Sequence, residues 1–316
     1  MYLSLDEITG YELEITSRCN ANCPDCIRTS SKTLKLRDDI ILQDIQLEDF
    51  KNWFTKKYVK NQIFDFCGTL GDASVHKDCL LFVEHLSNND AKTISVVTNG
   101  STRTPDWWKD LAKMSGVVFS IDGLEDTNHI YRKRTSWNKI MENVSAFINA
   151  GGIATWEYLI FDHNEHQIDE AKVLAKKLGF SEIIFKKTAR RFVLGKDTRS
   201  YESANNVKFG NTIQTYAIQC KWKKDLRVFV SAYDRLWPCC HWATSDQAIT
   251  RLEGEYDMDF NNLNRYSIDE ILNSDFFKND LEKSWESQNK YRPCALKCNV
   301  KTGNIEWREN DRAVAF

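Results

Sequence analysis

Neither a long apolar run nor a large net charge is found in this sequence of 316 residues. No apolar stretch approaches the roughly 18 residues that a membrane-spanning helix needs. The first residues, MYLSLDEITG, have neither the basic region nor the apolar stretch of a signal peptide. The net charge of −2 argues against bulk binding to nucleic acid or to an anionic membrane. We therefore expect a cytoplasmic protein with no nucleic-acid and no membrane partner.

Cysteine, in contrast, is abundant. Ten cysteines are many for a chain in a reducing compartment, where disulfides are rare and thiols more often bind metal or react. Cys19, Cys23 and Cys26 lie together near the beginning of the chain, and five others fall in its last third. Cys67 and Cys79 stand alone, and we expect them to be plain buried thiols. The distribution predicts two separate thiol sites.

Strand-like and helix-like segments alternate along the first part of the chain. Strands are predicted over residues 11–16, 62–66, 93–97, 117–121, 154–160 and 182–185, and helices over 47–58, 76–86, 104–114, 137–149 and 165–178. This order predicts an α/β fold, a partial (β/α)6 TIM-like barrel, with its site at the carboxyl ends of the strands.

The pattern changes after Arg191. A polar connector is followed by a predicted hairpin over 226–230 and 233–237, and then by a predicted helix over 267–285. We therefore expect a barrel domain over residues 1–200 and a small α+β cysteine-rich domain over residues 201–316.

The first thiol group has the spacing Cys19-x3-Cys23-x2-Cys26. A closed structural zinc site needs four ligands, so three thiolates would have to borrow a distant fourth. A four-iron cluster held by three cysteines instead keeps one iron free for an exchangeable ligand. Both interpretations are open on the triplet alone.

Further motifs carry a family resemblance. The loop CGTLGDAS at residues 67–74 follows the second predicted strand, TNG (98–100) ends the third, SIDG (120–123) ends the fourth, and NHIYR (128–132) follows. Together with the cysteine triplet they resemble the radical S-adenosylmethionine (SAM) superfamily over about residues 11 to 190. One departure is that Gly71-Asp72-Ala73 stands where the family has Gly-Glu-Pro.

The resemblance implies a chemistry and a set of site residues. A [4Fe–4S] cluster on Cys19, Cys23 and Cys26 would bind SAM and cleave it reductively to a 5′-deoxyadenosyl radical, which abstracts hydrogen from a substrate. A flavodoxin- or ferredoxin-type partner would supply the electron. The SAM contacts implied by the matching motifs are Gly71, Asp72, Asn99, Ser120, Asp122 and Arg132. Ser120 would face the ribose, and Arg132, with Arg134 as its rival, the methionine carboxylate.

The second thiol group resembles a twitch domain, the one-cluster version of the SPASM extension. The resemblance implies that Cys220, Cys239, Cys294 and Cys298 hold an auxiliary [4Fe–4S] cluster. Cys240 is an alternative to Cys239, and a four-thiolate zinc site is an alternative to the cluster.

A basic run, KKTARR at residues 186–191, follows the sixth predicted strand. Lys187, Arg190 and Arg191 are candidates to bind a phosphate or carboxylate of the substrate, although such a run can also be a solvated surface.

We hypothesise a radical SAM oxidoreductase that dehydrogenates a polar small molecule and passes an electron to the auxiliary cluster. The short segment before the first predicted strand leaves no room for a peptide-recognition domain, which favours a small substrate. The alternatives are a radical SAM peptide-modifying enzyme (a RiPP maturase) and a non-catalytic iron–sulfur or zinc protein.

Overall fold

One sheet organises the computed structural model, which describes residues 2–30, 33–188, 190, 192–193, 200–201, 217–243, 256–257, 259–287, 290–298 and 312–316. Its strand order is β10-β9-β1-β2-β3-β4-β5-β6-β11. The first six strands run parallel in chain order: β1 (Gly10–Leu13), β2 (Ile63–Phe66), β3 (Thr93–Thr98), β4 (Gly116–Ser120), β5 (Ala154–Ile160) and β6 (Glu182–Lys187). The predicted α/β fold is confirmed.

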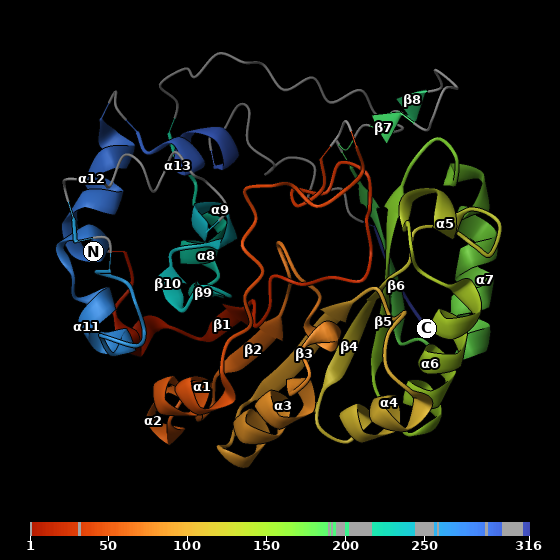
Figure 1. Ribbon diagram of the computed structural model, residues 1–316, viewed down its shortest axis with the longest axis horizontal. Helices are drawn as coiled ribbons and strands as arrows, with labels where there is room; N and C mark the ends of the chain where they lie inside the picture. Colours follow the sequence, from red (N-terminus) through yellow and green to blue (C-terminus); the bar gives the residue numbers. More distant parts are fainter. Residues whose placement is uncertain are drawn as a thin grey trace.

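The C-terminal part extends both edges of this sheet. The strand β9 (Arg227–Ser231) is parallel to β1, and β10 (Arg235–Trp237) is antiparallel to β9. At the other edge β11 (Arg312–Ala315) is antiparallel to β6. The barrel is therefore partial and open, since β1 and β6 are not paired with each other (Figure 1). A separate short pair is formed by β7 (Phe192–Val193) and β8 (Ser200–Tyr201). The domain division at residue 200 stays a prediction.

Helices cover the convex face of the sheet (Figure 1). Those that follow the parallel strands are α1 (Leu47–Trp53), α2 (Lys56–Val59), α3 (Cys79–Asn88), α4 (Pro105–Ala112), α5 (Asn128–Tyr131), α6 (Trp137–Asn149) and α7 (Ile168–Leu178). Short 3-10 turns occur at η1 (Leu5–Glu7), η2 (Ala73–Val75) and η3 (Glu165–Gln167). None of the described helices has the length and hydropathy needed to cross a bilayer.

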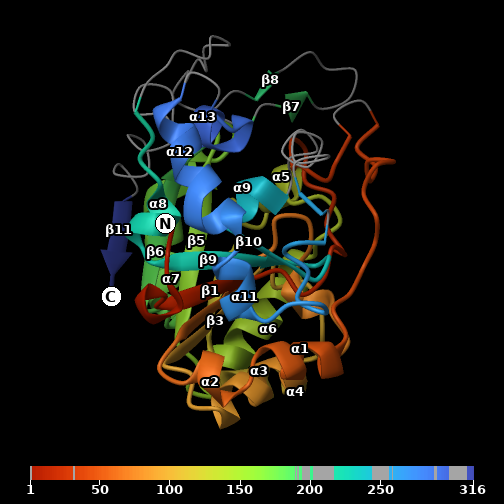
Figure 2. The same cartoon turned by 90° about the vertical axis from the view of Figure 1, so that its left-hand side faces the viewer.

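The C-terminal helices gather beside β9 and β10 (Figure 2). They are α8 (Lys221–Lys224), α9 (Cys240–Ala243), α11 (Ile268–Leu272), α12 (Leu281–Glu286) and α13 (Arg292–Lys297). The single helix expected over 267–285 is instead α11, the π-helical turn η4 (Phe276–Asp280) and α12. Phe276 and Phe277 are both fully buried, and the wider π turn allows two adjacent aromatic rings to face the core.

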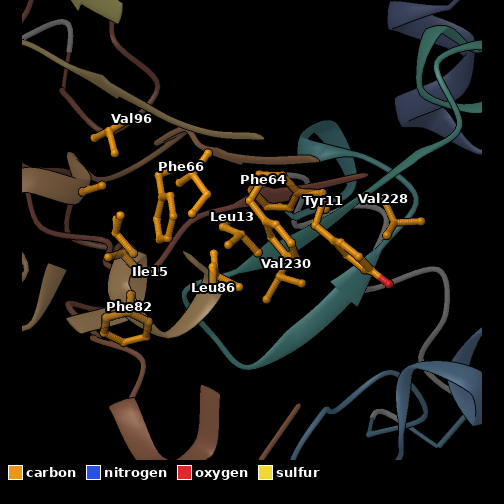
Figure 3. Packing of buried hydrophobic residues seen from close by; sticks show 14 of the residues in the cluster. Tyr11, Leu13, Ile15, Phe64, Phe66, Phe82, Leu86, Val96, Val228 and Val230 are labelled. Atoms are coloured by element: carbon orange, nitrogen blue, oxygen red, sulfur yellow. The ribbon is translucent and has the colours of Figure 1, made fainter. Parts of the chain in front are cut away.

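The two faces of β1 have opposite roles. Tyr11, Leu13 and Ile15 point toward the helices and pack with Phe64 and Phe66 of β2 (Figure 3). Because side chains alternate along a strand, the intervening Glu12 and Glu14 face the concave side. Apolar packing on the convex side thus places two carboxylates inside the open barrel.

Removing the ring of Phe64 should cost stability, because the ring lies between Phe54 and a stacked Tyr11 with centroid distances of 5.5 and 5.3 Å. We expect Phe64→Ala to lower the free energy of unfolding by about 3 to 5 kcal/mol in urea denaturation. Leu81→Ala is the control, because Leu81 is 44% exposed on α3, and it should change stability by about 0.5 kcal/mol or less. Equal losses in the two variants would contradict this packing.

Candidate functional site

A cavity of about 130 Å³ lies at the carboxyl ends of the parallel strands. Its walls come from the loop after β1 that carries the cysteine triplet (residues 16–26, the cysteine loop), the loop after β2 (residues 67–74, the glycine loop) and the ends of β3 and β4. The lining residues are Cys19, Ala21, Cys23, Cys26, Arg28, Gly68, Thr69, Leu70, Gly71, Asp72, Val97, Thr98, Asn99, Ser120, Arg132 and Arg190. The structure thus brings together the cysteine triplet and most of the residues that the sequence motifs nominated.

The cysteine loop is compact and largely dry. The Cys26 amide donates to the Cys23 carbonyl at 3.2 Å, and Asp25 between them adopts a positive φ of 56°. The Ala21 amide lies 3.4 Å from the sulfur of Cys19. Burial raises the pKa of the Cys19 thiol to about 12, and the charge of Asp72 adds to this. The bare thiol is therefore protonated at neutral pH, and a bound metal must displace its proton.

The glycine loop packs against the cysteine loop at close range. A Cβ on Gly71 would lie 1.8 Å from the carbonyl oxygen of Thr16, and one on Gly68 would lie 1.5 Å from the carbonyl oxygen of Gly71. The Asp72 amide donates to the Arg18 carbonyl at 2.9 Å. Only glycine allows these approaches: Gly68 permits the tight turn of the glycine loop, and Gly71 permits its contact with the cysteine loop.

Asp72 connects the glycine loop to the end of β3. Its carboxylate accepts from the Ser74 amide at 3.0 Å, the Thr98 hydroxyl at 2.9 Å and the Asn99 amide at 2.8 Å. The Asn99 side chain also donates to Asp72 at 2.5 Å and reaches Asn20 in the cysteine loop at 2.8 Å. Asp72 lies at the cavity, but protein donors occupy its carboxylate.

A second carboxylate lies behind the wall of the cavity. Asp122 is fully buried and accepts from Nε of Arg132 at 2.6 Å and from the Leu159 amide at 2.7 Å. Burial raises the pKa of Asp122, and Arg132 partly offsets this effect. The structure places Arg132 at the cavity, whereas its rival Arg134 is exposed.

The residues of the basic run after β6 lie in different places in the structure. Arg190 lines the cavity and donates to the Tyr131 hydroxyl. Lys187 does not line the cavity, and by strand alternation it shares the convex side with Phe185. Arg191 lies outside the described residues. Of the three substrate candidates, only Arg190 is brought to the site.

Two residues at the site were not found from the sequence. Glu14 accepts from the Leu70 and Gly71 amides at 2.5 and 3.2 Å and so holds the glycine loop from behind. Arg28 is buried and lines the cavity, and its Nη1 has no hydrogen-bond partner within the described part of the chain. The sequence signals for both residues were weak. Glu14 is only the second acidic residue of the alternating YELEIT strand, and Arg28 is only a basic residue two positions after Cys26.

A four-iron cluster fits this donor set. Three thiolates on a doubly charged cluster core give a net negative charge, and a buried cation without a partner favours an anionic ligand. Arg28 supplies such a cation beside Cys19, whose thiolate its charge stabilises. The residues that would hold the group are Cys19, Cys23 and Cys26.

The second group of cysteines surrounds Tyr2, near the beginning of the chain; Cys239, Cys294 and Cys298 are buried and Cys220 is half-buried. The Tyr2 hydroxyl lies 3.5 Å from the sulfur of Cys220. Burial raises the pKa of Tyr2, and the nearby Cys220, Cys239 and Cys294 raise it further. Cys298 donates to Cys220 and lowers the pKa of its thiol to about 6. The four cysteines nominated from the sequence are therefore close together.

Cys240 lies between the glycine loop and the C-terminal cysteines. It raises the pKa of the Cys67 thiol, next to the glycine loop, and it also raises the pKa of its neighbour Cys239. Cys239, in turn, raises the pKa of Cys298 together with Cys220 and Cys294. Among the described residues, no three His, Cys, Asp or Glu side chains converge as the ligands of one ion would.

Comparison with protein families gives two matches. The model of the radical SAM superfamily matches residues 13–175, which is more than half of the chain. The SPASM model, an iron–sulfur cluster-binding domain, matches residues 220–299. No curated protein sequence matches the chain.

Solved structures share the fold at low sequence identity. Streptococcus suis SuiB bound to S-adenosylmethionine is 11% identical, with a TM-score of 0.56 over 76% of this chain and 62% of that chain. The enzyme anSMEcpe with bound AdoMet is 14% identical, with a TM-score of 0.55 over 92% and 88%. BtrN in complex with AdoMet and 2-DOIA is 12% identical, with a TM-score of 0.51 over 95% and 96%. The match spans less than two thirds of that SuiB chain.

Ionisation of Glu14 should make stability depend on pH. Burial raises the pKa of Glu14 from about 4.5 to about 7. Between these values the folded chain binds more protons than the unfolded chain, so the free energy of unfolding falls as the pH rises. The contribution of Glu14 to the free energy of unfolding is about 3 kcal/mol larger at pH 4 than at pH 8.

Glu14→Gln should remove this fall in stability, because glutamine does not titrate. Its amide oxygen can still accept from the Leu70 and Gly71 amides, so the loop should keep its position. We expect urea denaturation of the cluster-free protein to show a flatter stability profile for the variant from pH 4 to pH 8. Glu48→Gln is the control, since Glu48 is on the surface of α1. Parallel profiles for wild type and Glu14→Gln would show that Glu14 does not titrate in this range.

Proposed function

Because the chain belongs to the radical S-adenosylmethionine superfamily, we propose that it oxidises a polar small molecule after abstracting a hydrogen atom from it. It is a radical SAM enzyme that uses SAM, a [4Fe–4S] cluster and an auxiliary [4Fe–4S] cluster in its SPASM domain. The substrate, the direction of the redox change and the residue roles given below are our proposals.

We assign the SAM-binding cluster to Cys19, Cys23 and Cys26, which line the cavity together. When bound, this cluster and SAM supply a 5′-deoxyadenosyl radical by one-electron cleavage of the sulfonium, with a flavodoxin- or ferredoxin-type protein as reductant. The protein positions the ligand: Glu14 and Asp72 fix the backbone of the glycine loop. Arg28 and Arg132 place positive charge where carboxylate groups can bind.

The observation that carries the substrate proposal is the charge on the concave face of the sheet. Lys186 of β6 donates to Glu157 of β5 at 2.5 Å, and Arg227 of β9 donates to Asp65 of β2. Glu12 of β1 lies between these strands, and burial raises the pKa of its carboxyl group. A concave face of the sheet that carries charged and hydrogen-bonding groups suits a substrate with several polar groups.

An oxidation requires a second electron to leave the substrate. Removal of one hydrogen atom gives a substrate radical, and loss of one electron and one proton from it completes a two-electron dehydrogenation. We assign Cys220, Cys239, Cys294 and Cys298 as the ligands of the auxiliary cluster that receives this electron. Four protein ligands leave no iron free for substrate, which favours an electron-transfer role.

A second candidate function is peptide modification. Two of the similar structures are peptide complexes: SuiB bound to precursor peptide SuiA, and anSMEcpe with AdoMet and Cp18Cys peptide. These likenesses concern the fold at 11 and 15% identity. They favour a peptide as the alternative substrate of the same radical chemistry.

SAM cleavage is tested with the anaerobically reconstituted protein, SAM and dithionite, by measuring 5′-deoxyadenosine. We expect Cys19→Ala, Cys23→Ala and Cys26→Ala in combination to reduce the product to the level of a protein-free mixture. Cys79→Ala is the matched control, because Cys79 is buried in α3 outside the cavity. Product formation by the triple variant would refute the assignment of the three ligands.

The two substrate classes are separated by deuterium transfer. A deuterium-labelled cell extract, which contains both small molecules and peptides, is supplied either untreated or after exhaustive proteolysis of the extract. Deuterium in 5′-deoxyadenosine is then measured by mass spectrometry. We expect transfer to survive proteolysis, because a small molecule is not digested. Transfer that is abolished by the protease would replace our proposal with the peptide-modifying function.

A further inference from the structure

Three aromatic side chains with polar hydrogens surround the C-terminal cysteines. Trp242 of α9 is fully buried, with Phe276 and Tyr291 packed edge-on at centroid distances of 5.0 and 5.1 Å. Trp285 of α12 packs edge-on against the buried Tyr2 at 6.3 Å. These contacts fix the indole rings, so the directions of their N–H groups are set by the fold.

Both indole N–H groups lie close to the sulfur of one cysteine, Cys294. Each Nε1 is buried, and neither Trp242 nor Trp285 reaches an ordinary hydrogen-bond acceptor among the described residues. Burial raises the pKa of Cys294 to about 12, while Trp285 and Trp242 both act in the opposite direction as donors to its sulfur. The sulfur of Cys294 thus lies beside both N–H groups, but neither group makes a regular hydrogen bond to it in the cluster-free chain.

A second cysteine of the group, Cys220, also has polar neighbours. The Lys223 amide donates to the sulfur of Cys220 at 3.5 Å. The Tyr2 hydroxyl lies 3.5 Å from the same sulfur, and its own proton is donated to the Pro238 carbonyl at 3.1 Å. A buried N–H without an acceptor costs about 1 to 3 kcal/mol. Two such indoles beside four cysteines therefore indicate that an acceptor is completed there when the cluster is bound.

We propose that Trp242 and Trp285 donate N–H hydrogen bonds to the cluster ligand Cys294 and thereby raise the reduction potential of the auxiliary cluster. The reduced cluster carries one more negative charge than the oxidised cluster. A donor to a ligand sulfur stabilises that charge, so it favours reduction. The inference rests on the proposed ligand set, and it makes the cluster a better electron acceptor, as substrate oxidation requires.

A purely structural role for the two indoles predicts a different result. If the rings only fill space and exclude water, phenylalanine should preserve the potential wherever the cluster is retained. The Trp→Phe change removes the N–H donor and keeps a flat aromatic ring. The reduction potential therefore separates the two roles, whereas stability or activity alone would not.

The test uses the full chain with Cys19, Cys23 and Cys26 changed to Ala, so that the reconstituted cluster is at the C-terminal site. The midpoint potential is measured by redox titration followed by electron paramagnetic resonance. We expect Trp242→Phe and Trp285→Phe each to shift the potential to a more negative value, and the double variant to shift it further. Trp108→Phe is the control, because its buried indole N–H donates to the Thr102 carbonyl in the barrel, and it should shift nothing.

An unchanged potential with iron retained would overturn the inference. A second measurement needs no substitution: the protein is labelled with ¹⁵N at the indole nitrogen, and the reduced cluster is examined by electron–nuclear double resonance. Coupling to indole nitrogen is expected, and its absence would also overturn the inference. If the C-terminal site holds no iron, the ligand assignment fails as well, while 5′-deoxyadenosine formation by the wild-type chain still tests SAM cleavage separately.

Discussion

The close contact between the glycine loop and the cysteine loop is the constraint on which the site depends. Gly71 packs directly against the Thr16 carbonyl, and the Asp72 amide donates to Arg18. The same loop donates two amides to Glu14 and, through Asp72, holds Thr98 and Asn99. One backbone contact therefore fixes three strand ends around one cavity. Any side chain at Gly71 would separate the thiols from the groups that face them.

Hydrophobic periodicity and glycine positions predicted individual helices and strands well, because both signals lie within the segment that they describe. The helix over 137–149 and the strand over 154–160 were predicted with the bounds that the structure has, because hydrophobic periodicity and glycine at 151 and 152 mark their ends. The parallel pairing of β9 with β1 was not predicted, since periodicity gives no strand order. The helix over 267–285 was predicted wrongly as one element, because a pattern of apolar residues does not reveal a π turn.

The site likewise has residues that the sequence predicted and residues that it did not. The cysteine triplet and the motifs near Gly71, Asn99 and Ser120 are short, and their spacing predicted the family and its cofactors, which the family matches confirm. Glu14 and Arg28 were missed because their meaning comes from the folded chain. The donors to Glu14 lie more than 50 residues away, and Arg28 is informative only because its buried Nη1 has no hydrogen-bond partner among the described residues.

The central claim is that two separate thiol groups each hold an iron–sulfur cluster. The most direct test is the amount of iron and acid-labile sulfide per chain after anaerobic reconstitution, with Cys19, Cys23 and Cys26 all changed to Ala. The account predicts that about four irons and four sulfides remain, held by the C-terminal cysteines. Loss of all iron, or zinc in its place, would contradict it and would remove the electron acceptor on which the proposed oxidation depends.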